Sequence, residues 1–476
     1  MLKEWQLSKF CGKLANYFKG MQDNREKFEH FRQRYPIFTY DSYQYKQVGQ
    51  DIYLQFRFLV GDDIVFEPQS IIKYHPDFAN FFAHHSLSDL DTLFFHIGMI
   101  ELISYWKSVC SPKILIKANS LPKASIDFWK KLYFNGLGEF FFVNNIHTTI
   151  DHFVEIEAED REVPLIDVDL YDKTIVPIGG GKDSVVTLEA LRNKKDVMPM
   201  IINPRGATVD CAKTAGFDNN FMEIKRTICP NLLTLNAQGY LNGHTPFSAM
   251  LAFYTMLLAC LSGRKNVALS NENSANEATV IGSDVNHQYS KSLEFESDFR
   301  NYIAKYINDK LNYYSFLRPL TELQIAYLFA KNPSYFPSFK SCNVGSKTNV
   351  WCGNCAKCLF TFTILSPFID ISTLKTIYGS DLFENESLLE TLKELCGMKP
   401  TKPFECVGTI CEVCLSLVNS MKKYDVLPFL LAFFEKTQQY QQYKNISLQQ
   451  ELQKWNEENF LQADEKQLLK ELLNIK

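Results

Sequence analysis

A strand followed by three consecutive glycines and a helix, at residues 174–191, constrains the fold of this chain more than any other stretch. The segment Thr174–Ile178 is apolar and β-branched, which predicts a buried strand. Gly179–Gly181 follow, and a glycine backbone can adopt positive φ and approach a ligand closely. Apolar residues then recur at helical spacing over Val185–Leu191. The stretch therefore predicts a strand–turn–helix unit of a parallel α/β sheet.

The glycine turn predicts an anion site, because free N–H groups at the N-terminus of a helix attract negative charge and phosphate is the usual ligand. The turn is not a Walker loop, in which Lys precedes Ser or Thr, because Lys182 is followed by Asp183. It is not the dinucleotide fingerprint either, because its glycines are contiguous. The residues alone therefore predict a phosphate site of another type.

Composition limits the class of protein. The chain has 476 residues, 46% hydrophobic and 22% charged, which predicts two or three domains with a large core. A net charge of -4 argues against a nucleic-acid binder, which usually presents a basic face. The longest apolar run, 247–261, is shorter than a membrane span of roughly 20 residues and predicts a buried helix. The 13 cysteines, without a secretory signal pattern, predict a reducing compartment.

Changes in periodicity predict three domains with an α/β fold at the centre. We expect an N-terminal α+β domain at 1–170, a doubly wound parallel α/β domain at 171–366 and a C-terminal helical domain at 367–476. Ligands of doubly wound sheets bind at the carboxyl ends of the strands. Residues 179–184, 203–206 and 270–276 should therefore meet at one edge.

Shorter stretches carry their own predictions. Strands are expected at 113–117, 197–203, 221–224, 232–235 and 266–270. Residues 136–143 should lead into a further strand, and the Gln-, Glu- and Lys-rich region 448–473 predicts one surface helix.

Four cysteines spaced C-x9-C-x2-C-x2-C predict a metal site. They are Cys342, Cys352, Cys355 and Cys358. Two-residue gaps let neighbouring thiolates converge on one ion, and Gly353 permits a tight turn between them. Four thiolates leave no open coordination position, so the expected zinc is structural. An iron–sulfur cluster and unliganded buried cysteines are the alternatives.

A polar run follows the strand expected at 266–270. It contains Asn271, Glu272 and Asn273, and a second polar stretch continues at 285–296. Such residues cannot form a core, and their position after a strand predicts contact with a substrate. The alternative interpretation is a solvated loop.

The glycine turn resembles the Ser-Gly-Gly-x-Asp-Ser loop of the ATP-pyrophosphatase (PP-loop) superfamily, with Gly179 where that superfamily usually has Ser. Further motifs follow in order: Asn242–Pro246, Ser270–Ala275, Asn286–Ser292, Leu317–Leu320, Trp351–Cys358 and Lys402–Gly408. With Gly136–Phe140, this ordered set is similar to the UDP-N-acetyl-α-D-muramoyl-L-alanyl-L-glutamate epimerase family of the bacterial cell wall. A similar cysteine cluster occurs in the PP-loop enzyme that makes cyano-deazaguanine.

The resemblance implies a cytoplasmic reaction in which the terminal L-glutamate of the UDP-muramoyl dipeptide becomes D-glutamate while ATP is cleaved to AMP and diphosphate. An α-proton beside a free carboxylate is weakly acidic, and adenylation of the carboxylate makes that proton easier to remove. Gly179–Gly181, with Lys182 and Ser184, would hold the β and γ phosphates. Asp183 would bind Mg²⁺, so Lys182 and Asp183 are expected to act in catalysis.

Epimerisation needs a proton-transfer group on each face of the α-carbon. His244, His287 and Cys406 are the candidates, with a structural histidine and a buried apolar thiol as the alternative interpretations. Four basic residues are candidates for pairing with phosphates or carboxylates of the substrate. They are Arg205, Lys291, Arg318 and Lys402.

Two other functions fit the same residues. The first is a different PP-loop reaction, either cyano-deazaguanine synthase-like or tRNA-thiolating, although a tRNA enzyme should be more basic. The second is a zinc-stabilised nucleotide-binding module without catalysis, which the presence of Lys182, Asp183 and Ser184 disfavours. Neither a nucleic acid nor a membrane is an expected partner, and the sequence does not indicate the oligomeric state.

Overall fold

The protein is described by a computed structural model that covers residues 23–280, 282 and 286–475. Its contacts divide the chain into two compact units. The first unit comprises the chain up to Ile71, Leu87–Ile166 and Arg226–Tyr254, and the second comprises Ile72–Ser86, Asp167–Lys225 and the chain from Thr255. The predicted domain boundaries at 170 and 366 describe parts of the chain that would fold independently. Contacts within the folded protein do not test independent folding, so these boundaries stay a prediction. Residues 1–22 and Val285 lie outside the described part.

The first unit is built on a twisted sheet around an antiparallel pair. Its strands are β1 (Ile37–Val48), β2 (Asp51–Val60), β3 (Ile64–Phe66), β4 (Gln69–Ile72), β5 (Lys113–Ile116) and β6 (Glu155–Ala158). β1 and β2 pair antiparallel across a two-residue turn in which Gly49 has φ of 63°, a conformation that glycine adopts without strain. On β2, alternate residues are buried, so one face of the strand packs on the core.

The first unit also contains several α-helices. They are residues 23–34, α3 (Asp91–Trp106), α4 (Ile126–Gly136), α5 (Gly138–Val143) and α8 (Pro230–Ala237), while the residues of α9 (Phe247–Ser262) are divided between the two units. α3 is buried along almost its whole length, and its Phe95 ring stacks on Tyr40 of β1 at 5.6 Å. Within the described residues, none of the helices is both long and apolar enough to cross a bilayer.

Two strand predictions in this unit are wrong. Residues 232–235 lie in α8, which begins at Pro230 because proline favours the first helical position. Leu232 and Leu235 are its buried residues, a spacing of three that suits a helix rather than a strand. Residues 138–143 form helix α5 instead of leading into a strand, with Phe140 and Phe141 buried.

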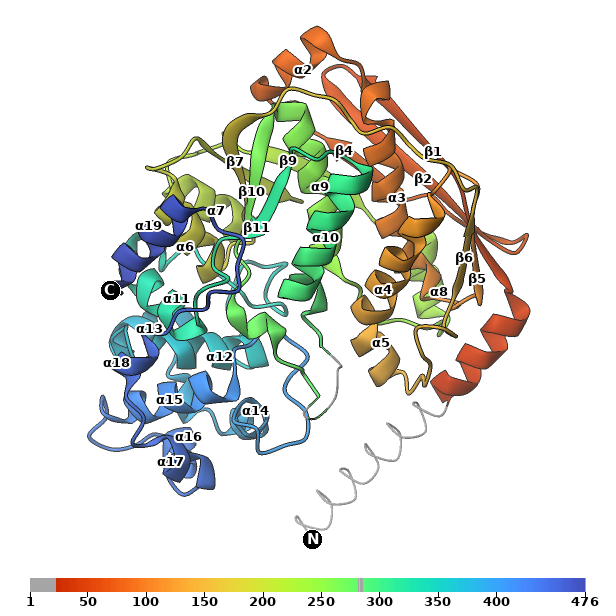
Figure 1. The fold of residues 1–476 in the computed structure, drawn as a ribbon. Helices are drawn as coiled ribbons and strands as arrows, with labels where there is room; N and C mark the ends of the chain where they lie inside the picture. The colour runs from red at the N-terminus through yellow and green to blue at the C-terminus, as the bar shows by residue number, and fades with distance from the viewer. Residues whose placement is uncertain (1–22, 281, 283–285, 476) are drawn as a thin grey trace. The chain divides into compact units, whose positions relative to one another are not determined.

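The second unit contains a parallel sheet. Its strands are β7 (Tyr171–Pro177), β8 (Val197–Ile202), β9 (Met222–Thr227), β10 (Arg264–Leu269) and β11 (Asn312–Ser315). Their order is β11-β10-β7-β8-β9, and every neighbouring pair is parallel. Helix α6 (Lys182–Leu191) lies on one side of the sheet and α10 (Leu293–Tyr306) on the other (Figure 1). The expected α/β fold is confirmed, and the strand order reverses between β7 and β10, where such sheets bind ligands.

Helices that follow the sheet complete the second unit. They are α11 (Glu322–Ala330), α12 (Ala356–Leu365), α13 (Ile371–Tyr378), α14 (Leu389–Leu395), α15 (Ile410–Met421), α16 (Phe429–Phe434), α17 (Gln438–Tyr443), α18 (Leu448–Glu451) and α19 (Ala463–Leu473). The two helices α2 (Ala79–His84) and α7 (Ala207–Thr214) precede them. One hydrophobic core includes Val176 of β7, Leu188 of α6, Phe360 of α12 and Leu469 of α19. The C-terminal helices therefore share the core of the parallel sheet.

The region 448–473 is two helices rather than the expected one. Between them the chain runs past Gln324, whose side-chain amide donates to the carbonyls of Leu452 and Lys454 at 3.1 and 2.6 Å. A capping box between Gln462 and Glu465 then starts α19. Tertiary hydrogen bonds thus replace the helical ones that the local composition favours.

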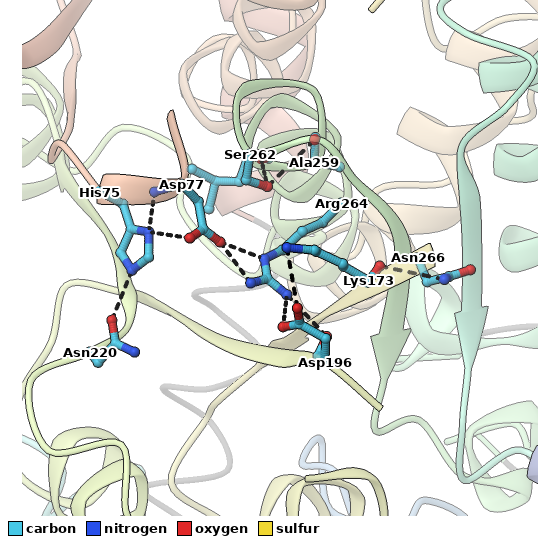
Figure 2. Close-up of polar contacts among 10 residues, drawn as sticks. His75, Asp77, Lys173, Asp196, Asn220, Ala259, Ser262, Arg264 and Asn266 are labelled. Carbon is cyan, nitrogen blue, oxygen red and sulfur yellow. Dashed lines mark hydrogen bonds and ion pairs between the residues drawn. The ribbon is translucent and has the colours of Figure 1, made fainter. Parts of the chain in front are cut away.

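Residues 72–86 belong to the second unit although the chain on both sides of them belongs to the first, and Arg264 of β10 holds them there (Figure 2). Its guanidinium is 3% exposed and pairs with Asp77 at 2.7 Å and Asp196 at 2.9 Å. His75 extends the cluster through Nε2, which lies 3.1 Å from the Asn220 side-chain oxygen. The buried Arg264 charge is paired with two partly exposed carboxylates, as burial of a charge requires, and the cluster has a structural role.

Candidate active site

The glycine turn after β7 uses each of its glycines differently. Gly180 has φ of 78°, and a Cβ there would meet the backbone of Ala207 and Thr208 at 2.8 Å, so only glycine fits. A Cβ at Gly181 would lie 2.8 Å from the Ser341 hydroxyl. A Cβ at Gly179 would meet nothing within 4 Å, so the site has room for the serine that the PP-loop superfamily usually has at this position. The contact of Gly180 with Ala207 also brings the segments after β7 and β8 together, as expected.

Helix α6 begins immediately after this turn. Gly181 is its N-cap, and the Ser184 hydroxyl donates to the Gly181 carbonyl at 3.1 Å. Free N–H groups and the positive end of the helix dipole therefore face the turn. Asp183, in the first helical turn, keeps 31% of its side chain exposed. A turn of this kind can hold a phosphate, and the exposed carboxylate can hold a cation beside it.

Lys182 is buried at the start of α6 rather than directed into solvent. Its ammonium group lies 2.5 Å from Asp183 and also donates to the Glu322 carboxylate. Burial opposes the charged form, but the two carboxylates outweigh it and raise the pKa of Lys182. Lys182 therefore carries a positive charge held at the turn by two acidic partners.

Three buried carboxylates interact near Lys182: Glu322 pairs with the lysine, and two others act on Glu322. Only one of the three was expected from the sequence. The three are Glu272, Glu322 and Glu412. Burial and the neighbouring acidic groups raise the pKa of Glu322 to about 8, despite the opposing effect of Lys182. The Glu412 carboxylate accepts the backbone N–H of Glu322 at 2.6 Å, which holds the start of α11 against α15. The chemistry of Glu322 was missed because its role depends on contacts distant in sequence.

A thiol lies next to a lysine in the same unit. The Lys291 ammonium donates to the Cys406 sulfur at 3.1 Å. Burial disfavours the thiolate, but Lys291, a hydrogen bond from His287 and Lys357 together lower the pKa of Cys406 to about 6. Cys406 is therefore mainly a thiolate at neutral pH, which is the form that accepts a proton. Two expected proton-transfer candidates, His287 and Cys406, are brought together here.

Lys291 interacts electrostatically with both the thiol and the glycine turn. Burial acts against its charge, but Cys406, Glu272 and Asp183 overcome that effect and raise its pKa. Burial alone would raise the pKa of Asp183, but Lys182, Lys357 and Lys291 together outweigh burial and lower it. The Cys406 thiolate, the Lys291 cation and the Asp183 carboxylate at the glycine turn thus form one electrostatic cluster.

His244 lies in the first unit, whereas Cys406 and His287 lie in the second. Its Nδ1 is 3.7 Å from the Glu139 carboxylate, and its side chain is 27% exposed. His244 remains a predicted proton-transfer residue.

Arg318 is fully buried and bonded to protein groups. Its guanidinium pairs with Glu296 at 3.0 Å and donates to the carbonyls of Glu272 at 2.7 Å and Lys291 at 2.5 Å. It therefore fixes the backbone of Lys291, a member of the electrostatic cluster, and of Glu272, which acts on Lys291. Nearby, the Asn271 amide donates to Ser315 at 3.0 Å.

The remaining expected substrate residues lie in varied surroundings. Asn273 accepts a hydrogen bond from Asn456 at 2.8 Å. Lys402 is 4% exposed and pairs with Glu277 at 2.6 Å, whereas Arg205 is exposed. The structure thus gives Asn273 and Lys402 protein partners, and it leaves Arg205 on the surface.

The four cysteines of the expected metal site converge. Their sulfur atoms all lie within 4.8 Å of one another, with Cys342–Cys355 at 3.8 Å, Cys352–Cys358 at 3.7 Å and Cys355–Cys358 at 3.5 Å. Zinc–sulfur bonds of about 2.3 Å in a tetrahedron require sulfur separations of about 3.8 Å. The arrangement therefore fits a four-thiolate metal site. Gly353, with φ of 67°, makes the expected turn between two of the ligands.

The chain matches two models of one protein family. The model described as the MurL N-terminal domain matches residues 29–316, and the MurL C-terminal domain matches residues 338–462. A Xanthomonas oryzae pv. oryzae protein named UDP-N-acetyl-alpha-D-muramoyl-L-alanyl-L-glutamate epimerase is 36% identical over 323 residues, covering 66% of this chain and 70% of that relative.

Two further relatives with the same name are similar to this chain. Those from Micromonospora sp. and Salinispora tropica are 34% and 32% identical over 349 residues, covering 71% of this chain and 77% and 76% of the relatives. No solved structure matches the chain. The family models extend over most of the sequence and agree with the named relatives, and the chain therefore belongs to the MurL family.

Proposed function

We propose that the protein converts the terminal L-glutamate of UDP-N-acetylmuramoyl-L-alanyl-L-glutamate to D-glutamate, in the synthesis of cytoplasmic peptidoglycan precursors. The observation that carries the proposal is the Lys291–Cys406 contact of 3.1 Å, which supplies a thiolate base in the same unit as the phosphate turn. The three relatives are named for this epimerisation, and the family membership supports it for this chain.

ATP would activate the substrate before the proton moves. An oxygen of the glutamate α-carboxylate attacks the α-phosphorus of ATP, the bond to diphosphate breaks, and an acyl adenylate forms. The anhydride no longer carries the carboxylate charge, so loss of the α-proton leaves an enolate-like anion instead of a dianion. The N–H groups of the glycine turn would bind the phosphates, and the partly exposed Asp183 would hold Mg²⁺. The buried Lys182 ammonium at the start of α6 would offset part of the negative charge of the phosphates.

Proton transfer would then occur at the activated carbon. The Cys406 thiolate takes the α-proton from one face, and a second acid returns a proton on the other face. His287 hydrogen-bonds to Cys406, so the two side chains would approach the carbon from the same side, and His287 would serve to lower the pKa of the thiol. Water then cleaves the adenylate to give AMP and the epimerised carboxylate. Arg318 supports this step by fixing the backbone of Lys291.

One experiment tests both halves of the proposal. The protein is incubated with ATP, Mg²⁺ and the L-glutamate dipeptide substrate in deuterated water, and AMP and α-deuterated D-glutamate are measured. We expect both products, and neither without ATP. AMP without deuterium would indicate another PP-loop adenylating reaction, and the absence of both products would overturn the proposal.

The four cysteines would hold structural zinc. Four thiolates close the coordination sphere, so a zinc ion bound by them stabilises the fold rather than binding substrate. Elemental analysis of the purified protein should give about one zinc per chain. Iron with absorption in the visible range would instead indicate an iron–sulfur cluster.

A further inference from the structure

Two residues of the cysteine loop, residues 342–358, contact the segment that carries the reactive thiol. Asn343 follows Cys342 directly, and its amide donates to the Glu405 carboxylate. Lys357 lies between Cys355 and Cys358, and its ammonium donates to the Cys406 carbonyl. The loop therefore contacts two successive residues of the Cys406 segment from two of its own positions.

The Cys406 segment depends on such side-chain contacts. Residues 402–409 lie in neither a helix nor a strand, so no regular backbone ladder fixes them. At one end, Lys402 donates its backbone N–H to Thr279 at 2.9 Å. At the other end, Thr409 caps α15 through Glu412 at 2.8 Å. Between these two anchors, the contacts from Asn343 and Lys357 hold the thiol-bearing residues.

Helix α12 joins the cysteine loop to the same segment a second time. Cys355 is the N-cap of α12, and Cys358 lies in its first turn. Two residues further along α12, the ring of Phe360 lies against Gly408, where an added Cβ would come within 3.2 Å of it. A displacement of the start of α12 would therefore move both Lys357 and the surface on which Gly408 rests.

We propose that the four-cysteine site, beyond stabilising the fold, positions Cys406 for proton transfer, with Lys357 and Asn343 as the positioning residues. A metal bound by the four thiolates fixes the cysteine loop, and the two hydrogen bonds transmit that fixed geometry to the Cys406 backbone and its neighbour. Lys357 additionally places a positive charge near the thiolate. The inference rests on the proposed role of Cys406 as a base, but its geometric part concerns the thiol alone.

The test measures the reactivity of the Cys406 thiol separately from the rate of catalysis. Alkylation of Cys406 by iodoacetamide is followed against pH by peptide mass spectrometry, together with zinc content and the steady-state rate. In Lys357→Met we expect the apparent pKa of Cys406 to rise by about one unit. We also expect kcat to fall about ten- to hundred-fold with an unchanged KM for ATP and unchanged zinc content. Lys357→Arg, which keeps a donor and a charge, should recover most of the rate.

Matched variants separate positioning from general damage. Asn343→Ala should lower kcat with zinc retained, because it removes the second contact. Lys347→Met changes an exposed lysine of the same loop and should change neither alkylation nor rate. Cys352→Ser, which removes a metal ligand, should lose zinc and shift the alkylation profile of Cys406 in the same direction as Lys357→Met.

Two outcomes are decisive and distinguishable. If Lys357→Met and zinc-depleted protein alkylate Cys406 with the wild-type pH profile, and Lys357→Met keeps its rate, the positioning inference is wrong. If Lys357→Met and Cys352→Ser show the expected alkylation changes but the wild-type protein forms neither AMP nor deuterated product, the proposed function fails while the link from the metal site to the thiol stands.

Discussion

The ammonium group of Lys291 lies 3.1 Å from the sulfur of Cys406, and each residue changes the protonation of the other. The thiol pKa is lowered to about 6, against burial, by Lys291, His287 and Lys357. The lysine pKa is raised, against its own burial, by Cys406 and the acidic groups near it. The pair therefore carries opposite charges at neutral pH.

The rate of epimerisation should fall on the acidic side of pH 6. A thiol with a pKa of about 6 is a thiolate above that pH and becomes protonated as the pH drops through it. Replacement of Lys291 by Met removes the positive charge that lowers the pKa of Cys406 most. The pKa of Cys406 should therefore rise, and the acidic limb of the profile should move to higher pH. The pH profile of kcat checks this, with Lys347→Met as the control. An unshifted limb would show that another group titrates.

Cys406→Ser should separate activation from proton transfer. A serine hydroxyl has a far higher pKa than a thiol and cannot serve as the base, whereas the glycine turn is unaltered. We expect substrate-dependent AMP formation to continue, with α-proton exchange lost for one epimer of the substrate and retained for the other. The two epimers are incubated separately in deuterated water and analysed by mass spectrometry. Loss of exchange for neither epimer would remove Cys406 from the mechanism.

The glycine turn offers two variants with opposite expectations. Gly180→Ala forces a side chain into positive φ and against the backbone of Ala207, so it should cost about 1–2 kcal/mol or more and abolish AMP formation. Gly179→Ser restores the residue usual in the PP-loop superfamily, and an added Cβ there meets nothing within 4 Å. It should therefore fold with wild-type stability and retain AMP formation. Equal behaviour of the two variants would contradict this assignment.

Arg318→Met should destabilise the second unit strongly. The change leaves Glu296 buried without its 3.0 Å partner, and loss of one member of a buried ion pair costs about 3–5 kcal/mol. Denaturant unfolding followed by fluorescence should show the loss, and Arg318→Lys should lose less because it keeps the charge. Arg205→Met, at an exposed position, is the control and should change little. A wild-type unfolding midpoint for Arg318→Met would contradict the structural role of this pair.

The features predicted best from the sequence are those determined by neighbouring residues. The Gly179–Gly181 turn follows a β-branched strand and precedes a helical repeat, so the α/β unit could be inferred from local pattern alone. The cysteine spacing likewise predicts convergence, because the C-x2-C steps are short enough for local geometry to bring sulfur atoms together.

The features missed depend on contacts between distant residues. Glu322 directly follows Thr321, which caps α11, and Glu412 is the third residue after Thr409, which caps α15. The capping-box patterns Thr321–Gln324 and Thr409–Glu412 could have marked those two helix starts. No local pattern could show that the two carboxylates meet near Lys182, which precedes them by more than a hundred residues. The same reason explains Lys357, whose partner Cys406 follows it in the chain only after the two α-helices α13 and α14.

The shared core of the parallel sheet and the last helix bears on how the protein is made. Val176 and Leu469 belong to one hydrophobic cluster, and the Tyr314 hydroxyl bonds to Glu465 of α19. A ribosome delivers these partners in order, so the sheet emerges long before the helix that covers part of it. The second unit can reach its final packing only when translation has passed Leu473 and that helix has left the exit tunnel. Until then the nascent sheet exposes apolar surface, and a molecular chaperone that shields it would have its longest period of action on this unit.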